Sequence, residues 1–563
     1  MLHLNYKNTV NGFDYMNELS KLFLNIKNGY TVKLKKDYVY HVSQEDSFHL
    51  TGFYCSNTAK KNENPAGTRK AAIFLENKRD ITIDGNGATI MIHGKMTPLV
   101  LYKCHNVKIT NLTIDYACPT MSEFDILENN NGKCKIKIHD DCLYRMEGDN
   151  IIWHGEIGSD GKPYWEQPYV ADKRHLKLYD TKNNITQDIN RNKLKFNNVK
   201  DLGDNLLVFE LEDTDVPFRE GCTVQTRNIV RDQTGALFER CSNLHFENLR
   251  VMFMHGLGMV SQYCENVSYI NCNFNPKEGR TAASTADFFQ FSGCKGTILI
   301  ENCQAKGAHD DFVNVHGTHL QITQADYENK RLVVCFKNDE SWGFQAFDTG
   351  DVIDFIKWNT LIPFGTNKVK SYKRLDDTHI ELFLENDIPP VEIGKDVIEN
   401  ATCTPDLIVR NCSFGLTAGR GILCTTRGDV LIENNTFDGL WGPALLIEDD
   451  CNFWFESGFT KTIIFRNNTI IGCDYGKTYP DSPTIRYSPK VMKEDSTEFV
   501  HGELILYNNT FKKCYGEKHC INLEYLEGAE IRDNCFDKTF KVNKKCVGKV
   551  VVDGNIIHKH KEV

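Results

Sequence analysis

Features that would place a chain in a membrane or on nucleic acid are missing from this sequence. It contains no run of about 18 or more apolar residues, the length that a membrane-spanning helix needs. Its 66 basic and 76 acidic residues give a formal net charge of -10 at pH 7, without a long block of one sign. This balance provides no large cationic surface for phosphate groups, so neither a membrane nor a nucleic acid is expected as a partner.

The N-terminus lacks the marks of a secretory signal, because it has no basic start, no apolar stretch and no small-residue cleavage site. As written, the sequence therefore predicts a cytoplasmic protein. If a signal was removed, an extracellular or periplasmic location is expected instead, and the native compartment stays open.

The cysteines show no metal-binding spacing, since no pair of CxxC motifs occurs, and a structural zinc site has little support. There are 21 cysteines, an odd number spread along 563 residues. Small disulfide scaffolds have denser patterns. Several cysteines recur at one place in a repeat, namely Cys104, Cys241, Cys264 and Cys294. We therefore predict buried thiols that fill small apolar positions.

What the sequence does contain is a short repeated phrase. An Asn is followed by Asn, Cys or Leu, then by a small or polar residue and an apolar one, as in NCNFNP at Asn271 and NNTFDG at Asn434. The spacing is 23 residues from Asn248 to Asn271 and again from Asn411 to Asn434. A strand of alternating apolar residues precedes each phrase, with the period of two of a half-buried strand.

Each unit is too short for a βαβ crossover and has no helical periodicity, so it can bury its apolar side only by stacking on the next unit. The sequence therefore predicts an all-β protein, a right-handed parallel β-helix. The repeated Asn and Cys positions would form internal ladders, which is a structural role rather than a functional one.

Two stretches interrupt the repeat and read as small antiparallel β modules, barrel-like, that are inserted into loops of the helix. Long insertions in a solenoid usually fall on its binding side. The predicted organisation is N-terminal coils in 1–121, a first module in 122–228, coils with an acid cluster in 229–317, a second module in 318–402 and C-terminal coils in 403–563.

The acid cluster follows from counting along the repeat. The phrase ADFFQFSG, which contains Asp287, matches DDFVNVHG, which contains Asp311, and Asp310 precedes the latter directly. Leu257 and Arg420 occupy the equivalent positions of neighbouring units. Adjacent strands lie about 4.8 Å apart, so the three carboxyl groups should share one small patch. Such crowding raises the pKa of at least one of the three carboxyl groups. It is therefore expected only where a neighbouring group offsets the repulsion or where the acids have a function.

Hydrolysis of a glycosidic bond uses one carboxylic acid to protonate the leaving oxygen and one carboxylate to handle the nucleophile. Leu257 beside Asp287 disfavours charge there, whereas Arg420 favours an ionised Asp311. We therefore assign Asp287 as the acid, and Asp310 with Asp311 as the basic pair. A calcium site or a solvated acidic ladder is the alternative.

Residues suited to binding a sugar surround this patch, because aromatic faces pack on the apolar side of a pyranose and polar groups bind its hydroxyls. Any one of them could instead be structural: His316 could be an ordered ladder residue, and Glu448 and Asp449 could form a turn. The predicted substrate-binding residues are Arg280, His309, Asn314, His316, Arg420, Trp441, Glu448 and Asp449.

Three segments carry a family resemblance: RDITIDGNGATIMIHGKMTP at 79–98, NLTIDYACPTMSEF at 111–124 and, most specifically, HDDFVNVHGTHLQI at 309–322. The sequence resembles the family 110 glycoside hydrolases, α-1,3-galactosidases that act on blood group B type structures. The resemblance implies a β-helix with two inserted β-barrel modules, an inverting reaction without a metal cofactor, and catalytic roles for Asp287, Asp310 and Asp311. Carboxyl groups stacked near 5 Å would by spacing alone suggest retention.

Two other functions remain open from the residues. A uronan (pectin-type) hydrolase or lyase would use a similar acid cluster, although a lyase would want calcium and a basic residue. A non-catalytic carbohydrate-binding β-helix would use the three aspartates as calcium ligands. The preference for branched or linear galactosides stays open, and so does the formation of a homo-oligomer.

Overall fold

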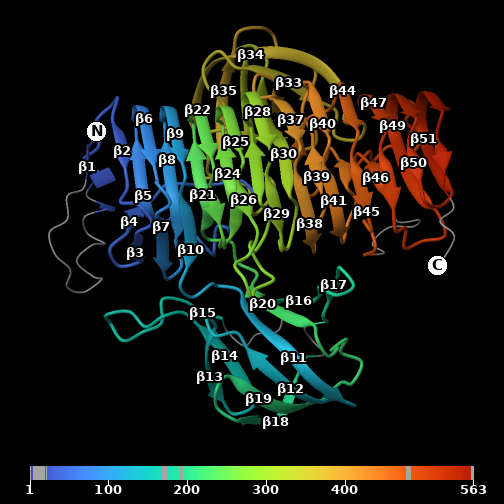
Figure 1. Cartoon of the computed structure of the whole chain (residues 1–563). Coiled ribbons are helices and arrows are strands. Elements are labelled where there is room, and N and C mark those ends of the chain that lie inside the picture. Colours follow the sequence, from blue (N-terminus) through green and yellow to red (C-terminus); the bar gives the residue numbers. More distant parts are fainter. Residues whose placement is uncertain are drawn as a thin grey trace.

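The computed structural model describes residues 2–3, 19–20, 22–23, 25–167, 174–190, 194–476 and 483–558. Nearly every regular element within them is a strand, and the strands of the main body run parallel in successive coils (Figure 1). The predicted all-β class and parallel β-helix are confirmed. No helix among the described residues is long and apolar enough to span a membrane.

The coils are built from three parallel stacks of strands, each hydrogen-bonded to the equivalent strand of the next coil. The first stack also receives β1 (Leu2–His3) beside β2. In order, the first stack contains β2 (Thr31–Lys33), β6 (Arg79–Asp84), β9 (His105–Thr110), β22 (Ser242–Glu247), β25 (Glu265–Ile270), β28 (Lys295–Glu301), β37 (Asp406–Arg410), β40 (Val430–Glu433), β44 (Thr462–Arg466), β47 (His501–Tyr507), β49 (His519–Arg532) and β51 (Phe540–Asp553).

The second stack carries the acid cluster. Two short strands pair with it antiparallel: β4 (Phe48–Leu50) with β5, and β43 (Glu456–Ser457) with β30. The stack contains β5 (Arg69–Glu76), β8 (Thr97–Tyr102), β21 (Thr234–Glu239), β24 (Leu257–Gln262), β27 (Phe289–Ser292), β30 (Val313–Thr318), β39 (Ile422–Cys424), β42 (Leu445–Ile447), β46 (Pro483–Tyr487) and the first part of β49.

The third stack follows the repeated Asn phrase in each coil. It contains β3 (Val39–Ser43), β7 (Thr89–His93), β10 (Thr113–Tyr116), β23 (Arg250–Val251), β26 (Asn273–Phe274), β29 (Gln304–Lys306), β38 (Ser413–Thr417), β41 (Thr436–Leu440), β45 (Thr469–Ile471), β48 (Thr510–Lys512), β50 (Cys535–Phe536) and β52 (Ile556–Ile557).

The repeated phrase has a conformational cause. Its first Asn adopts a left-handed backbone conformation wherever the phrase occurs, with φ of 54° at Asn271 and 56° at Asn434. Asn tolerates this region better than most residues, so it turns the chain from the first stack into the third. In the C-terminal coils the second Asn is buried, and Asn435 Nδ2 donates to Asn468 Oδ1 at 3.1 Å. These contacts hold successive coils in register.

The cysteines lie mostly inside the helix. All 21 are free thiols, and all but four are buried. Those at the repeated position donate to a backbone carbonyl of the preceding coil, as Cys264 Sγ does to Phe238 O at 3.2 Å and Cys294 Sγ to Ser261 O at 3.2 Å. They are small, weakly polar residues of the core.

The first inserted module lies below the coils in Figure 1 and has its own apolar core. Its described strands form an antiparallel sheet in the order β17-β16-β20-β11-β12-β19-β18 and a small sheet β13-β14-β15, an open order rather than a closed barrel. These strands are β11 (Ser122–Asn130), β12 (Lys133–Ile138), β13 (Leu143–Glu147), β14 (Asn150–His154), β15 (Glu166–Gln167), β16 (Arg174–Asp180), β17 (Ile185–Asp188), β18 (Phe196–Asp201), β19 (Leu206–Leu211) and β20 (Thr223–Asn228).

The second inserted module is a closed antiparallel barrel with the strand order β31-β32-β35-β34-β33-β36, which we call the barrel. A separate core that includes Trp342 and Phe355 fills it. Its strands are β31 (Leu320–Asp326), β32 (Arg331–Cys335), β33 (Val352–Ile356), β34 (Pro363–Arg374), β35 (His379–Leu384) and β36 (Val397–Asn400).

Candidate active site

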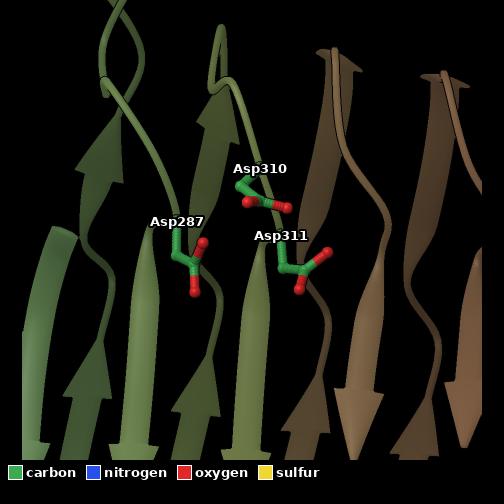
Figure 2. Close-up of side chains that lie close together, drawn as sticks. All are labelled: Asp287, Asp310 and Asp311. Atoms are coloured by element: carbon green, nitrogen blue, oxygen red, sulfur yellow. The ribbon is translucent and has the colours of Figure 1, made fainter. Parts of the chain in front are cut away.

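The register of the second stack brings the predicted acids together. Phe289 pairs with Val313, and Val313 pairs with Ile422. The residues two positions earlier, Asp287, Asp311 and Arg420, therefore follow one another in three successive coils, as counting along the repeat predicted. Figure 2 shows Asp287 and Asp311 where the chain leads into neighbouring strands, with Asp310 directly before Asp311.

The three carboxyl groups form one compact cluster. One oxygen from each of Asp287, Asp310 and Asp311 can be chosen so that all three lie within 4.8 Å of one another. Asp287 and Asp311 are buried, whereas the side chain of Asp310 is 39% exposed. Two acids of the cluster are thus buried, and the third is partly exposed to solvent.

Arg420 neutralises one side of this cluster. Its Nε donates to Asp311 Oδ1 at 2.5 Å and its Nη2 to Asp311 Oδ2 at 2.8 Å, which is a bidentate ion pair. The same Nη2 donates to Asp310 Oδ1 at 3.1 Å. Within the described part of the chain, the carboxyl group of Asp287 has no such partner.

The two buried acids therefore differ electrostatically. Burial raises the pKa of Asp287 well above its ordinary value, and the charges of Asp310 and Asp311 raise it further. Burial also raises the pKa of Asp311, to about 7, but here the charge of Arg420 opposes the increase. Asp287 consequently holds its proton to higher pH than Asp311 does, and the pair can supply an acid and a base at once.

A small pocket, partly open to solvent, lies over the cluster. Residues from the coils, from an N-terminal loop and from the loop before β43 line it: Asn57, Arg231, Leu257, Asp287, Gln290, Asp310, Asp311, Asn314, Arg420, Leu423, Glu448, Trp454 and Glu456.

Polar atoms without partners lie among these lining residues. Gln290 Oε1 and Asn314 Oδ1 are buried and accept no hydrogen bond from the described chain. Glu456 Oε1 accepts from Asn57 Nδ2 at 2.5 Å and lies 3.5 Å from Asn314 Nδ2. Buried polar groups are normally paired, so the free oxygens favour a ligand that carries hydroxyl donors.

Three of the predicted substrate-binding residues line this pocket: Asn314, Arg420 and Glu448. Glu448 accepts hydrogen bonds from Ser488 Oγ at 2.9 Å and from Lys490 Nζ at 2.8 Å. Burial would raise the pKa of Glu448, but the charge and hydrogen bond of Lys490, together with the charges of Arg420 and Arg486, lower the pKa below its ordinary value. Glu448 therefore presents an ionised carboxylate to the pocket.

Arg280 does not line the pocket and lies instead between the first module and the coils. Its Nε is 3.0 Å from Glu123 Oε2, and its Nη1 donates to Asp141 Oδ1 at 2.6 Å. Its Nη2 donates to Met121 O at 2.6 Å. Since Glu123 and Asp141 belong to the module, Arg280 holds the module on the coils, and its guanidinium group does not reach the pocket where a sugar contact was predicted.

His309 also lies outside the pocket lining, between two residues of β20. Arg227 Nε donates to His309 Nδ1 at 3.1 Å, so this nitrogen must be the acceptor, and His309 Nε2 donates to Gln225 Oε1 at 2.6 Å. Burial lowers the pKa of His309 well below its ordinary value, and the Arg227 charge adds to this. A neutral His309 in one tautomer thus links the first module to the chain just before Asp310 and Asp311.

The remaining predicted residues have structural partners as well. His316 Nδ1 lies 2.7 Å from Gly317 O, and its Nε2 lies 3.2 Å from Gln290 Nε2. His319 Nε2 donates to Asp449 Oδ1 at 2.8 Å, deep below the pocket. The ring of Trp441 lies under the ammonium group of Lys177, 5.4 Å away, on the side of the first module.

Several residues that line the pocket were not predicted from the sequence. Gln290 could have been found, because it occupies in DFFQ the position that Asn314 occupies in DFVN. Asn57, Trp454 and Glu456 lie in loops outside the repeat, and Arg231 lies just after the first module, so no periodic signal marks them.

The same three aspartates also have the donor set of a cation site, since hard cations take carboxylate oxygens. The guanidinium of Arg420 already engages both oxygens of Asp311 and one of Asp310. A divalent cation here would sit against that positive charge. The contacts present therefore fit a proton-transfer cluster better than a metal cage.

Comparison with known proteins supplies the family. A family model described as GLAA-B beta-barrel domain II matches residues 331–398, the region of the barrel. Alpha-1,3-galactosidase A of Bacteroides fragilis is 35% identical over 464 residues, which cover 82% of this chain and 74% of that protein. The chain belongs to the α-1,3-galactosidase family. The resemblance to family 110 glycoside hydrolases found in the sequence is confirmed.

Other α-1,3-galactosidases align over similar lengths. Alpha-1,3-galactosidase A of Akkermansia muciniphila is 33% identical over 494 residues, covering 86% of this chain and 78% of that protein. Alpha-1,3-galactosidase B of Bacteroides thetaiotaomicron is 30% identical over 451 residues, covering 78% of this chain and 71% of that protein. The match to the α-1,3-galactosidases therefore includes both coils and modules.

Proposed function

We propose that this protein is an exo-acting α-1,3-galactosidase, which releases terminal α-1,3-linked galactose from glycans of the blood group B type or from linear Gal-α-1,3-Gal. The observation that carries the proposal is the cluster of Asp287, Asp310 and Asp311 at the base of a small polar pocket, in a chain that belongs to the α-1,3-galactosidase family. No metal takes part in the proposed reaction.

Asp287 acts as the general acid in this proposal. Its raised pKa keeps a proton on the carboxyl group near neutral pH, because burial and the two neighbouring carboxyl groups outweigh the charges of Arg231 and Arg420. Among the described residues, no arginine or lysine forms an ion pair with Asp287. The proton passes to the glycosidic oxygen as the bond between this oxygen and the anomeric carbon breaks.

Asp311 with Asp310 acts as the base that takes a proton from the attacking water. Arg420 holds both carboxylates and favours the ionised form of Asp311. The half-exposed Asp310 provides the route by which water reaches the pair.

We further propose that the configuration at the anomeric carbon is inverted. The separation of at most 4.8 Å between the nearest oxygens resembles the about 5–5.5 Å of retaining enzymes more than the about 6.5–9.5 Å of inverting ones. However, both oxygens of Asp311 are engaged by Arg420, which makes this carboxylate a weak nucleophile and leaves it suited to orienting a water. The family resemblance also implies inversion.

The pocket supports exo action on a neutral sugar. It is small, and the buried side-chain oxygens of Gln290 and Asn314 have no hydrogen-bond donor among the described residues, so they can accept from sugar hydroxyls. Its two guanidinium groups are already paired, Arg420 with Asp310 and Asp311, and Arg231 with Glu340. A uronan-cleaving enzyme would want cations free to bind substrate carboxylates, so this alternative is disfavoured.

The direct test is to incubate the purified protein with Gal-α-1,3-Gal and with the fucosylated blood group B trisaccharide, and to measure released galactose. We expect release from at least one of them, with no effect of a chelator such as EDTA. If neither substrate yields galactose, the proposal fails. If calcium restores an activity that EDTA removes, the proposed metal-free reaction is wrong.

A further inference from the structure

The rim of the pocket carries the most exposed large apolar side chain among the described residues. Phe453, in the loop between β42 and β43, is 70% exposed. Its ring lies edge-on to the ring of Trp454, with centroids 5.2 Å apart, and Trp454 lines the pocket. Phe453 and Trp454, which is 39% exposed, thus place two adjacent aromatic rings beside the pocket, and aromatic side chains are common in the lining of ligand sites.

This loop is held rigidly. The buried carboxylate of Asp450 accepts backbone N–H bonds from Asn452 at 2.7 Å, Phe453 at 3.1 Å and Trp454 at 2.5 Å. Its own N–H donates to Glu456 O at 3.1 Å, which closes the loop. One buried charge therefore fixes the backbone that presents both aromatic rings.

The barrel supports the same loop from outside. Asn338 Nδ2 donates to Phe453 O at 3.0 Å, and Asn338 lies in the barrel between β32 and β33. The exposed ring is thus anchored from two sides, although it has little packing of its own. Pre-organisation of this kind lowers the entropy cost of binding a ligand.

We infer that Phe453, next to Trp454, is the platform for the leaving-group sugar, meaning the sugar to which the terminal galactose is attached. This inference rests on the proposed function. The three aspartates lie in the small pocket that Trp454 also lines, so a galactose bound at the aspartates would leave the next sugar at the rim, beside Trp454 and Phe453. Ring faces of hexoses carry C–H groups, which pack on an aromatic face, while their hydroxyls stay in water. The loop would therefore bind a neutral pyranose ring.

Asn338 and Asp450 are positioning residues in this arrangement. They touch the loop backbone and not the sugar. The barrel would consequently influence the choice of leaving group without contributing a group to the reaction itself.

The experiment compares two substrates that share the galactose but differ in the leaving group. Gal-α-1,3-Gal carries a leaving sugar, whereas α-galactosyl fluoride carries only fluoride. We expect Phe453→Ala to lower kcat/KM for the disaccharide about tenfold, equivalent to about 1.4 kcal/mol, with the loss confined to that substrate. Asn338→Ala, which frees the loop on one side, should show a smaller loss with the same selectivity.

Phe499→Ala is the matched control, since Phe499 is also an exposed Phe, 41% accessible, on the side of the C-terminal coils. We expect it to leave both activities at the wild-type level. Equal losses on both substrates for Phe453→Ala, or no loss on the disaccharide, would overturn the inference. A wild-type protein that cleaves neither of these substrates nor the fucosylated trisaccharide would instead refute the proposed function, and this inference with it.

Discussion

Asp287 and Asp311 are placed by the register of parallel strands, whereas the two inserted modules reach the same site through a few side chains. The first module contacts it at His309, which accepts a hydrogen bond from Arg227 Nε and donates one to Gln225 Oε1. The barrel contacts it through an ion pair between Glu340 and Arg231. The coils therefore supply the reacting groups, and the modules fix the chain beside them.

The difference between the two modules lies in what they control. His309 directly precedes Asp310 and Asp311, so the first module acts on the position of the base. Arg231 lines the pocket and lowers the pKa of Asp287, against burial and the two neighbouring carboxylates that raise it. The barrel thus acts on the pocket wall and on the acid.

The largest effect should come from the coils. Asp287→Asn removes the proton donor, and we expect kcat for Gal-α-1,3-Gal to fall about 10²–10⁴-fold, the usual contribution of a general acid or base. The matched control is Asp115→Asn, another buried coil acid whose pKa burial raises, which does not line the pocket. Steady-state kinetics of both variants test the role of Asp287 as the proton donor. Equal losses of kcat in the two variants would contradict this role.

A smaller effect is expected from the first module. Gln225→Leu removes the acceptor for His309 Nε2, which loosens the chain before Asp310 and Asp311. We expect kcat to fall about tenfold with little change in KM, because misplaced catalytic groups affect the transition state more than binding. Gln167→Leu alters another buried glutamine of the same module, outside this network, and should keep wild-type kinetics. An increase in KM alone for Gln225→Leu would mean that His309 contributes to binding.

The barrel should show the opposite pattern. Glu340→Gln weakens the ion pair that orients Arg231 in the pocket wall. We expect a rise in KM of a few fold with a smaller change in kcat, as expected when an interaction equal in ground and transition states is lost. Glu381→Gln breaks a second barrel ion pair, to Arg331 at 2.7 Å, away from the pocket, and serves as the control. A loss confined to kcat would remove the distinction between the modules.

The last effect concerns stability rather than activity. The pKa of Asp287 is raised in the folded state, so between the unfolded value of about 3.9 and the folded value the native protein holds a proton that the unfolded chain releases. Its contribution to stability therefore falls as pH rises through this window. The Asp287→Asn variant has no such proton. Its free energy of unfolding should therefore rise relative to that of the wild type by up to about 1.4 kcal/mol per pH unit above about pH 4.

Urea unfolding at several pH values measures this difference. Asp140→Asn is the control, because Asp140 is a highly exposed acid of the first module outside the cluster. A difference between Asp287→Asn and the wild type that does not change with pH would show that Asp287 is not held in its protonated form.

The coils could be predicted because their sequence signal is local. The repeated Asn adopts a left-handed conformation at each turn, which fixes the register, and the register in turn places Asp287 opposite Asp311. The two modules were visible as interruptions of the repeat. That the first is an open sheet and the second a closed barrel depends on long-range strand pairing, which no local pattern encodes.

The pocket walls were predictable only where they belong to the repeat. Asn314 and Arg420 follow from counting, but Trp454 comes from a loop whose shape depends on Asp450. Arg280 and His309 have the right residue types and sequence positions for a sugar site. Their side chains instead pair with Glu123 and Gln225 of the first module, contacts that bridge more than 80 residues.

The most direct test of the central claim follows the anomeric protons of galactose by NMR from the earliest times of Gal-α-1,3-Gal hydrolysis. If Asp287 protonates the leaving oxygen while Asp310 and Asp311 direct a water to the opposite face, β-galactose appears first and the α form arises later by mutarotation. If α-galactose appears first, the reaction proceeds with retention, one of these carboxylates is a nucleophile, and the assigned roles are contradicted.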